Sequence, residues 1–142
     1  MNIIYRIICA GLGIIFIWAS VDKIMYPSKF AEMVYHYKML PDILIHSVAL
    51  FLPWMELIIG LLLILGIWEQ GALIIYNGLI VVFMIGLSSA LIRGLDIHCG
   101  CFTVDPNAEK ELLMSLLRDI PLFIISMGCL FISIKNRKKA KI

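Results

Sequence analysis

The sequence predicts an all-α membrane protein, built as a bundle of four transmembrane helices. Of its 142 residues 62% are apolar and only 15% are charged, whereas soluble domains usually have about 25% charged residues. The apolar residues are concentrated in four stretches, each near or above the roughly 20 residues that cross a hydrocarbon core. The expected spans are residues 3–22, 43–68, 71–92 and 112–134. Too little chain remains for a soluble domain, so we expect one transmembrane domain over residues 1–142.

The first and third stretches support a membrane rather than a soluble protein. The basic region of the first stretch is a single Arg6, and no small-x-small cleavage pattern follows Val21, so we expect this stretch to stay as a helix. Residues 71–92 carry no charge on any helix face, unlike a core helix of a soluble domain. The lipid bilayer is therefore an expected partner, and we expect no nucleic-acid partner.

The distribution of basic residues predicts the orientation. Residues 135–142 form a tail with five Lys or Arg side chains directly after the fourth stretch. The positive-inside rule places this tail in the cytoplasm. With four spans, both termini then lie on the cytoplasmic side of the inner membrane. Residues 22–42 and 93–111 form the two outer loops, while the inner turn is expected at Glu69-Gln70.

We expect a short amphipathic helix in the first outer loop, between spans 1 and 2. It begins at Pro27-Ser28 and ends before Leu40-Pro41. Its apolar side chains share one helix face: Phe30, Met33, Val34 and Tyr37. The expected role is packing over the bundle, and the alternative is a lid over the second outer loop.

The second outer loop contains the residues that we expect to be catalytic, Cys99 and Cys101, separated by Gly100. Thiols outside the cytoplasm tend to pair. A Cys-x-Cys disulfide closes a small, strained ring, which Gly100 relieves in part. Strained, exposed disulfides are the labile or catalytic ones. Basic side chains nearby, His98 and Arg93, would stabilise the reactive thiolate.

Two alternatives use the same sequence differently. The two cysteines and His98 are soft ligands that suit copper, zinc or mercury, which predicts a metal-binding or transport protein. A structural subunit of a larger membrane complex is the other alternative, because small residues permit close helix packing. The relevant glycines are Gly60, Gly66, Gly71, Gly78 and Gly86.

Charged residues within the spans are the second candidate site. They are Asp22 and Lys23 at the end of the first span, Glu56 in the second, and Arg118 and Asp119 in the fourth. Ionised side chains at membrane depth are costly and normally face partners inside the bundle. Neighbours on a helix point about 100° apart, so we expect Arg118 to pair with Glu56 or Asp22, and Asp119 with Lys23. The pairs either fix helix order or form a polar pocket beneath the thiols.

The other two cysteines, Cys9 and Cys129, fall near the cytoplasmic ends of their spans. We expect both to be free and buried, where cysteine behaves as a small hydrophobe. About 25 Å of helix separates Cys129 from the outer loop, which excludes direct exchange with Cys99 or Cys101. The sequence therefore predicts one redox pair, whose electrons go to a cofactor or to another protein.

Several short patterns together carry a resemblance to a known family. They are Asp22-Lys23, Pro27-x-x-Phe30, Tyr37-x-x-Leu40-Pro41, Pro53-x-x-Glu56-x-x-x-Gly60, Arg93-Gly94, Cys99-Gly100-Cys101-Phe102 and Arg118-Asp119. In order and spacing the chain resembles the MauE/DoxX-like redox-associated membrane proteins over nearly its whole length. Thr103 departs from the glycine that often follows the Cys-Gly-Cys-Phe pattern.

The resemblance implies a four-helix membrane protein. MauE-like members are linked to disulfide formation in periplasmic proteins, and DoxX-like members to thiosulfate and quinone redox chemistry. We therefore predict a thiol-disulfide redox protein that exchanges with a thioredoxin-like or thiol-containing extracytoplasmic protein. As an enzyme it would be a thiol-disulfide oxidoreductase. Electrons would pass to or from a quinone held between helices near Glu56 and Arg118, although no residue requires a quinone.

Overall fold

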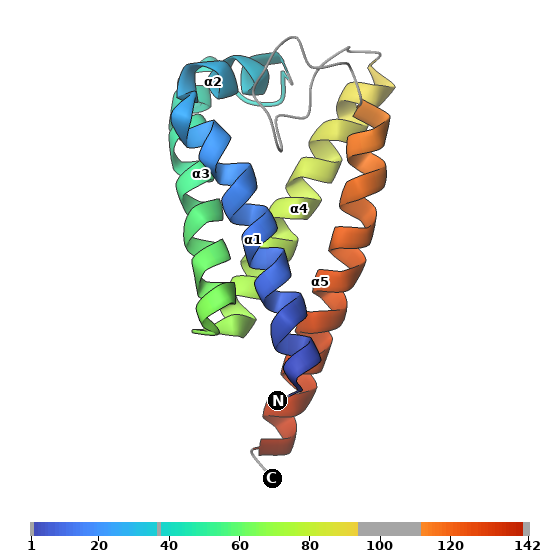
Figure 1. Ribbon diagram of the computed structural model, residues 1–142. Coiled ribbons are helices and arrows are strands. Elements are labelled where there is room, and N and C mark those ends of the chain that lie inside the picture. Colours follow the sequence, from blue (N-terminus) through green and yellow to red (C-terminus); the bar gives the residue numbers. More distant parts are fainter. Residues whose placement is uncertain (1, 37, 94–111, 141–142) are drawn as a thin grey trace.

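Four long helices run the length of the molecule, and a short helix lies across one end (Figure 1). The computed structural model describes residues 2–36, 38–93 and 112–140. The described helices are α1 (Ile3–Met25), α2 (Pro27–His36), α3 (Asp42–Leu65), α4 (Glu69–Ile92) and α5 (Leu112–Ala140). This all-α arrangement, with a short helix between the first two long ones, confirms the predicted fold class.

Each of the four long helices is apolar and long enough to cross a membrane. The segments that meet both conditions are Ile3–Met25, Asp42–Leu65, Glu69–Ser89 and Leu116–Lys139. Large apolar side chains such as Trp18, Ile43 and Phe131 point outward. An outer surface this apolar needs lipid rather than water around it. The chain is therefore a multi-pass membrane protein.

Helices α1 and α3 cross closely because each has a glycine at the contact. A Cβ atom on Gly13 would lie 2.5 Å from the carbonyl oxygen of Gly60. A Cβ atom on Gly60 would lie 2.7 Å from the carbonyl oxygen of Gly13. Small residues let membrane helices approach to this extent. The contact sets the register between α1 and α3, and so the height at which their charged side chains meet.

The turn between α3 and α4 comes earlier than the sequence predicts. Helix α3 ends at Leu65 because Gly66 has φ 72°, the left-handed conformation that commonly ends a helix. Helix α4 then begins at Glu69, so Glu69-Gln70 is its first turn rather than the connection. At the other boundary, α5 continues to Ala140. Lys and Arg are good helix formers, and their charge is favourable at a helix C-terminus.

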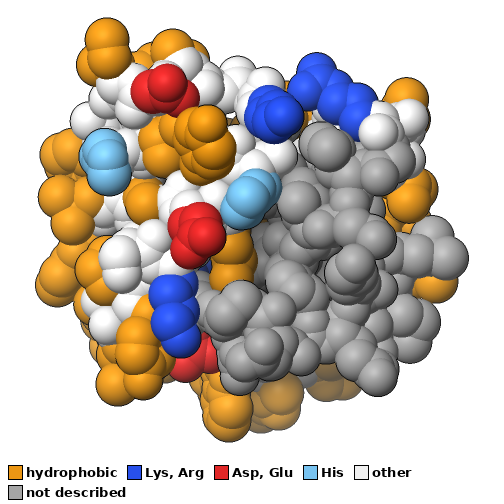
Figure 2. Space-filling model, turned by 90° about the horizontal axis from the view of Figure 1, so that it is seen from above, with side chains coloured by type: hydrophobic (Ala, Val, Ile, Leu, Met, Phe, Trp, Pro, Cys, Tyr) orange, Lys and Arg blue, Asp and Glu red, His pale blue; other side chains and the backbone are white. Residues whose placement is uncertain are grey.

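Helix α2 packs across the end of the bundle at which α1 ends and α3 begins. It buries Phe30, Ala31 and Met33 against Ile45 and Ala49 of α3. The amphipathic helix of the first outer loop is thus confirmed, although Tyr37 lies outside the described residues. Seen from this end, charged and histidine side chains lie among apolar ones over the described part of the surface (Figure 2).

Contacts between α1, α4 and α5 form the core in the half of the bundle away from α2. The rings of Phe16 and Tyr76 stack with their centroids 4.0 Å apart. The Ser126 hydroxyl donates a buried 2.8 Å hydrogen bond to Asn77 Oδ1, which joins α5 to α4. These contacts fix how α4 and α5 face α1, and so position the side chains described next.

Candidate functional site

A buried ion pair between α1 and α3 is the centre of the candidate site. Lys23, in the last turn of α1, donates hydrogen bonds of 2.9 and 2.8 Å to the two carboxylate oxygens of Glu56. Each of these side chains is only 1% exposed. Removing two charges from water costs several kcal/mol per ion, which only close pairing and further contacts can offset. The two short hydrogen bonds supply the first of those contacts.

Two aromatic rings from other helices supply further contacts to Lys23. Its Nζ lies 5.3 Å from the ring centroid of Phe30 on α2 and 4.9 Å from that of Phe83 on α4. A lysine at this distance from an aromatic face gains roughly 0.5–2 kcal/mol per ring. Helix α2 therefore covers a buried charge with Phe30. The expected role of α2 was packing over the bundle, and the part of the bundle that it covers includes the Lys23–Glu56 pair.

A third ionisable side chain, Asp119 on α5, lines a small cavity beside this pair. Asp119 is 6% exposed and interacts electrostatically with Lys23. The cavity measures about 30 Å³, which is room for about two water molecules. Small organic ligands usually occupy about 300–1,000 Å³, so this cavity is too small for a quinone ring. Its lining is Ile15, Phe16, Ala19, Lys23, Glu56, Ile80, Phe83, Asp119 and Leu122.

The structure corrects the expected partners of these charges. Both oxygens of Glu56 bind Lys23, so the expected Arg118–Glu56 pair is wrong. Arg118 Nε instead lies 3.7 Å from Asp119 Oδ1 on the same helix. The 100° between neighbouring residues does not prevent this, because the arginine side chain is long enough to fold back. Among the described residues no ion pair joins Arg118 to Asp22, and Asp119 acts on Lys23 at longer range than Glu56 does.

The other candidate residues that the structure describes lie at the same end of the bundle as Lys23. Asp22 is half-buried in the last turn of α1, and Arg93 directly follows α4 and is exposed. Helix α4 ends and α5 begins at this end, where Lys23 also lies (Figure 1). The expected catalytic Cys99 and Cys101, with His98, lie outside the described residues. In the described ranges, no group of three or more His, Cys, Asp or Glu side chains is placed to hold a metal ion.

A larger groove runs along α4 and α5 near Arg93. It measures about 560 Å³, within the usual range for a small organic ligand. Its wall is mostly apolar, and its polar side chains lie on the last turns of α4 and just after it. The lining residues are Val81, Met84, Ile85, Ser88, Ser89, Ile92, Arg93 and Phe123. This arrangement suits a lipid-soluble molecule with a polar ring at one end.

Comparison with known proteins decides the family. The family model described as methylamine utilisation protein MauE matches residues 1–132. The chain belongs to the MauE family. It is 32% identical over 100 residues to the methylamine utilization protein MauE of Methylorubrum extorquens, covering 70% of this chain and 52% of that protein. It is 30% identical over 92 residues to the MauE of Paracoccus denitrificans, covering 64% and 50%.

The MauE-family chain spans about half the length of these two relatives. No solved structure gives a significant match to it. The family assignment confirms the MauE resemblance drawn from the short sequence patterns.

Sequence reasoning missed the role of one aromatic residue in this MauE-family protein. Phe83 stands in an unbroken apolar run, and nothing in its spacing shows that its ring faces Lys23. Cys9 and Cys129 are free and buried, as expected. Both belong to the buried apolar core formed by α1, α3, α4 and α5.

Proposed function

We propose that this MauE-family protein is a membrane thiol–disulfide redox protein in which Cys99 and Cys101 exchange with an extracytoplasmic thiol or disulfide protein. The observation that carries the proposal is the buried Lys23–Glu56 pair with Asp119 beside it. These charges lie in the half of the bundle from which residue 93 leaves α4 and to which residue 112 returns. The Cys-Gly-Cys sequence belongs to that connection.

Thiol exchange needs groups that stabilise a thiolate and accept or release protons. Arg93 is exposed at the start of the connection and provides a positive charge near it. The Lys23, Glu56 and Asp119 cluster provides proton-exchanging groups around a cavity large enough for water. Charges at membrane depth are usually functional as well as expensive. We assign to the cluster the role of setting the electrostatic field and proton supply beneath the thiols.

Oxidation of a dithiol releases two electrons and two protons, so an acceptor is required. A lipid-soluble quinone, when bound, would supply a two-electron, two-proton acceptor. The cavity beside Glu56 is too small for it, whereas the groove of about 560 Å³ along α4 and α5 fits one. Its apolar wall would hold the ring, and Ser88, Ser89 and Arg93 would donate hydrogen bonds to the quinone oxygens.

The names of the two relatives state that those proteins serve methylamine utilization. We propose the same process as the setting of this chain. Deleting its gene in the source organism should then impair growth on methylamine as sole nitrogen or carbon source, and not growth on ammonium or a sugar. Unimpaired growth on methylamine would contradict this setting, and the thiol chemistry would then serve another process.

A trapping experiment tests the thiol chemistry itself. One thiolate attacks the partner and the other cysteine resolves the mixed disulfide. With Cys99 as the attacking thiol, Cys101→Ser should accumulate a covalent adduct with an extracytoplasmic thiol protein that a reductant releases. The matched control is the double variant Cys99→Ser/Cys101→Ser, which should form none.

The same variants separate exchange from the metal and subunit alternatives. If neither Cys99→Ser nor Cys101→Ser traps a partner, exchange is excluded. If the wild type then purifies with bound metal that either substitution removes, the cysteines are metal ligands. If neither an adduct nor metal is found but a complex partner copurifies with all variants, the chain is a structural subunit.

A further inference from the structure

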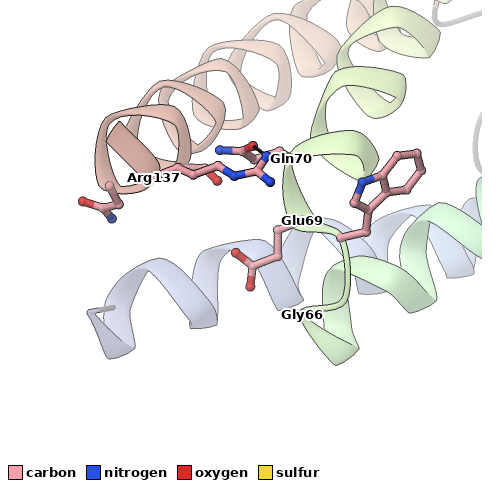
Figure 3. Close-up of a pocket in the computed structure, with 7 residues that line it drawn as sticks. Gly66, Glu69, Gln70 and Arg137 are labelled. Atoms are coloured by element: carbon pink, nitrogen blue, oxygen red, sulfur yellow. Dashed lines mark hydrogen bonds between the residues drawn. The ribbon is translucent and has the colours of Figure 1, made fainter. Parts of the chain in front are cut away.

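A polar pocket lies at the end of the bundle away from α2, between the α3–α4 turn and the last turns of α5 (Figure 3). It measures about 350 Å³ and opens to the surface. Helix α4 contributes Glu69 and Gln70, and α5 contributes Ser133, Asn136 and Arg137. The three α5 residues are spaced i, i+3 and i+4, so they share one face of that helix.

The carboxylate that lines this pocket is already neutralised. Arg6 on α1 donates a 2.5 Å hydrogen bond to Glu69 Oε1, and the Tyr5 hydroxyl donates one of 3.2 Å to Oε2. The Arg6 guanidinium lies against the backbone of Gly66, where a Cβ atom would overlap it. Because both of its oxygens are bonded and its charge is paired, Glu69 does not repel an anion from the rest of the pocket.

Arg137 is the cation that this pocket leaves without a counter-charge. Its Nη1 donates a 2.8 Å hydrogen bond to Oε1 of Gln70, which is a neutral amide (Figure 3). Among the described residues Arg137 forms no ion pair. Most of its N–H donors therefore remain available, in the planar arrangement that fits phosphate oxygens. The Ser133 hydroxyl and the Asn136 amide add neutral donors on the same helix face.

The level of the pocket in the bilayer indicates where an anion would come from. One candidate span ends at Leu65 and the next begins at Glu69, so the pocket lies where these spans leave the hydrocarbon core. Trp68 is 70% exposed there, and tryptophan is enriched at this level of a membrane. Ile74, one turn along α4 from Gln70, is 57% exposed. A phospholipid with its phosphate in the pocket therefore has apolar protein surface for its acyl chains.

The charge around the pocket favours a lipid with net negative charge. The last turns of α5 add three exposed ammonium groups, those of Lys135, Lys138 and Lys139. Clusters of basic side chains next to a membrane span attract anionic headgroups. The same groups repel the cationic part of a zwitterionic headgroup, so a phosphate without an attached cation is the better ligand.

We propose that this pocket binds the phosphate of an anionic phospholipid, with Arg137 as the main donor to its oxygens and Ser133 and Asn136 as further donors. The bound lipid connects the end of α5 to the start of α4. Helix α5 is the least buried of the four described spans, with 17% of its apolar window inside the protein against 33–39% for the others. The lipid therefore stabilises the helix that has the least protein around it.

This site is independent of the function proposed for Cys99 and Cys101. It lies at the opposite end of the bundle from Lys23 and from the helix ends that flank the Cys-Gly-Cys connection (Figure 1). No residue is shared between the two sites. Failure of lipid binding leaves the thiol chemistry unaffected, and failure of partner trapping leaves the lipid site unaffected.

The test measures lipid binding to the full chain in a non-ionic detergent by native mass spectrometry. Phosphatidylglycerol should bind more tightly than phosphatidylcholine, and Arg137→Gln should raise the Kd for phosphatidylglycerol by about tenfold or more. The matched control Lys138→Gln removes the same charge from the next position, which does not line the pocket, and should raise it by about threefold at most. Equal effects of the two variants, or equal binding of the two lipids, would overturn the proposal.

Gln70→Glu tests the pocket from its other wall and keeps Arg137 in place. The new carboxylate still accepts the hydrogen bond from Arg137 but pairs its charge, and an acidic residue is favourable in the first turn of a helix. The free energy of unfolding without lipid should therefore be unchanged or higher, while the Kd for phosphatidylglycerol rises by about tenfold or more. Unchanged lipid binding in this variant would refute the site.

A competition experiment distinguishes a lipid from a free phosphate ion. Excess inorganic phosphate should leave phosphatidylglycerol bound to the wild type, because the acyl chains contribute to its affinity. If inorganic phosphate displaces the lipid as readily as added phosphatidylglycerol does, the ligand is a soluble phosphate and the assignment to a lipid is wrong.

Discussion

The buried Lys23–Glu56 pair gives a quantitative prediction about stability. Lys23→Met removes the ammonium but keeps much of the side-chain volume, leaving the Glu56 carboxylate without its two hydrogen bonds of 2.9 and 2.8 Å. Breaking a buried pair from one side costs about 3–5 kcal/mol. The contacts of Nζ with Phe30 and Phe83 are lost as well. We therefore expect a loss at the upper end of that range.

Glu56→Gln should cost less than Lys23→Met. The amide oxygen still accepts a hydrogen bond from Lys23, and the two aromatic rings and Asp119 still face the ammonium. Losing one of the two hydrogen bonds to a charged group costs about 1.5–3 kcal/mol. Glu56→Gln is therefore expected to be the more stable of the two single variants, because Lys23 keeps other contacts when Glu56 is changed.

The double variant Lys23→Met/Glu56→Leu removes both charges at once. Buried pairs replaced by apolar residues of similar volume are often neutral or more stable. The loss of unfolding free energy in the double variant should therefore be much smaller than the sum of the losses in Lys23→Met and Glu56→Leu. Titration of the bilayer-mimetic micelles with a denaturing detergent, followed by circular dichroism, gives the four free energies of the cycle. Additive effects within about 0.5 kcal/mol would refute the pairing.

The same double variant separates a structural pair from a functional one. If it is stable and still traps the redox partner in the Cys101→Ser background, the charges serve helix packing alone. If it is stable but no longer forms the adduct, the pair contributes to thiol reactivity. The proposed role of the cluster predicts the second result.

Three further predictions follow from other parts of the structure. Gly13→Ala places a methyl group 2.5 Å from a backbone oxygen of α3 and should lower the free energy of unfolding by about 1–3 kcal/mol. Gly78→Ala is the control: its methyl group meets nothing within 4 Å, so it should be neutral or stabilising in the same unfolding titration. A membrane-impermeant thiol reagent added outside intact cells after mild reduction should label Cys99 and Cys101; labelling only after the inner face is exposed would reverse the predicted orientation. Ser88→Leu fills the proposed quinone groove and should abolish most photolabelling by a quinone analogue, and unchanged labelling would place the quinone elsewhere.

The sequence was sufficient for the fold because membrane spans depend on local composition. Four apolar stretches of adequate length predict four helices, and the spacing of Phe30, Met33 and Val34 predicts the buried face of α2. The helix boundaries at the α3–α4 turn were harder to predict from the sequence. The left-handed conformation of Gly66 ends α3 within an apolar run, where composition shows no change.

Partners across the bundle could not be predicted in the same way. Which carboxylate reaches Lys23 depends on the register that the Gly13–Gly60 contact sets between α1 and α3. Which face of α5 turns inward is equally hidden, because apolar residues surround that helix.

An apolar layer lies next to the Lys23 cluster, on the side toward the N-terminus of α1. It contains the stacked rings of Phe16 and Tyr76, with Leu12 and Leu73 in the same core. The Tyr76 hydroxyl is buried and has no hydrogen-bond partner among the described residues. No chain of polar contacts in the described part therefore leads from the Lys23 cluster across this layer. We expect protons exchanged at the cluster to enter from the end of the bundle that α2 covers.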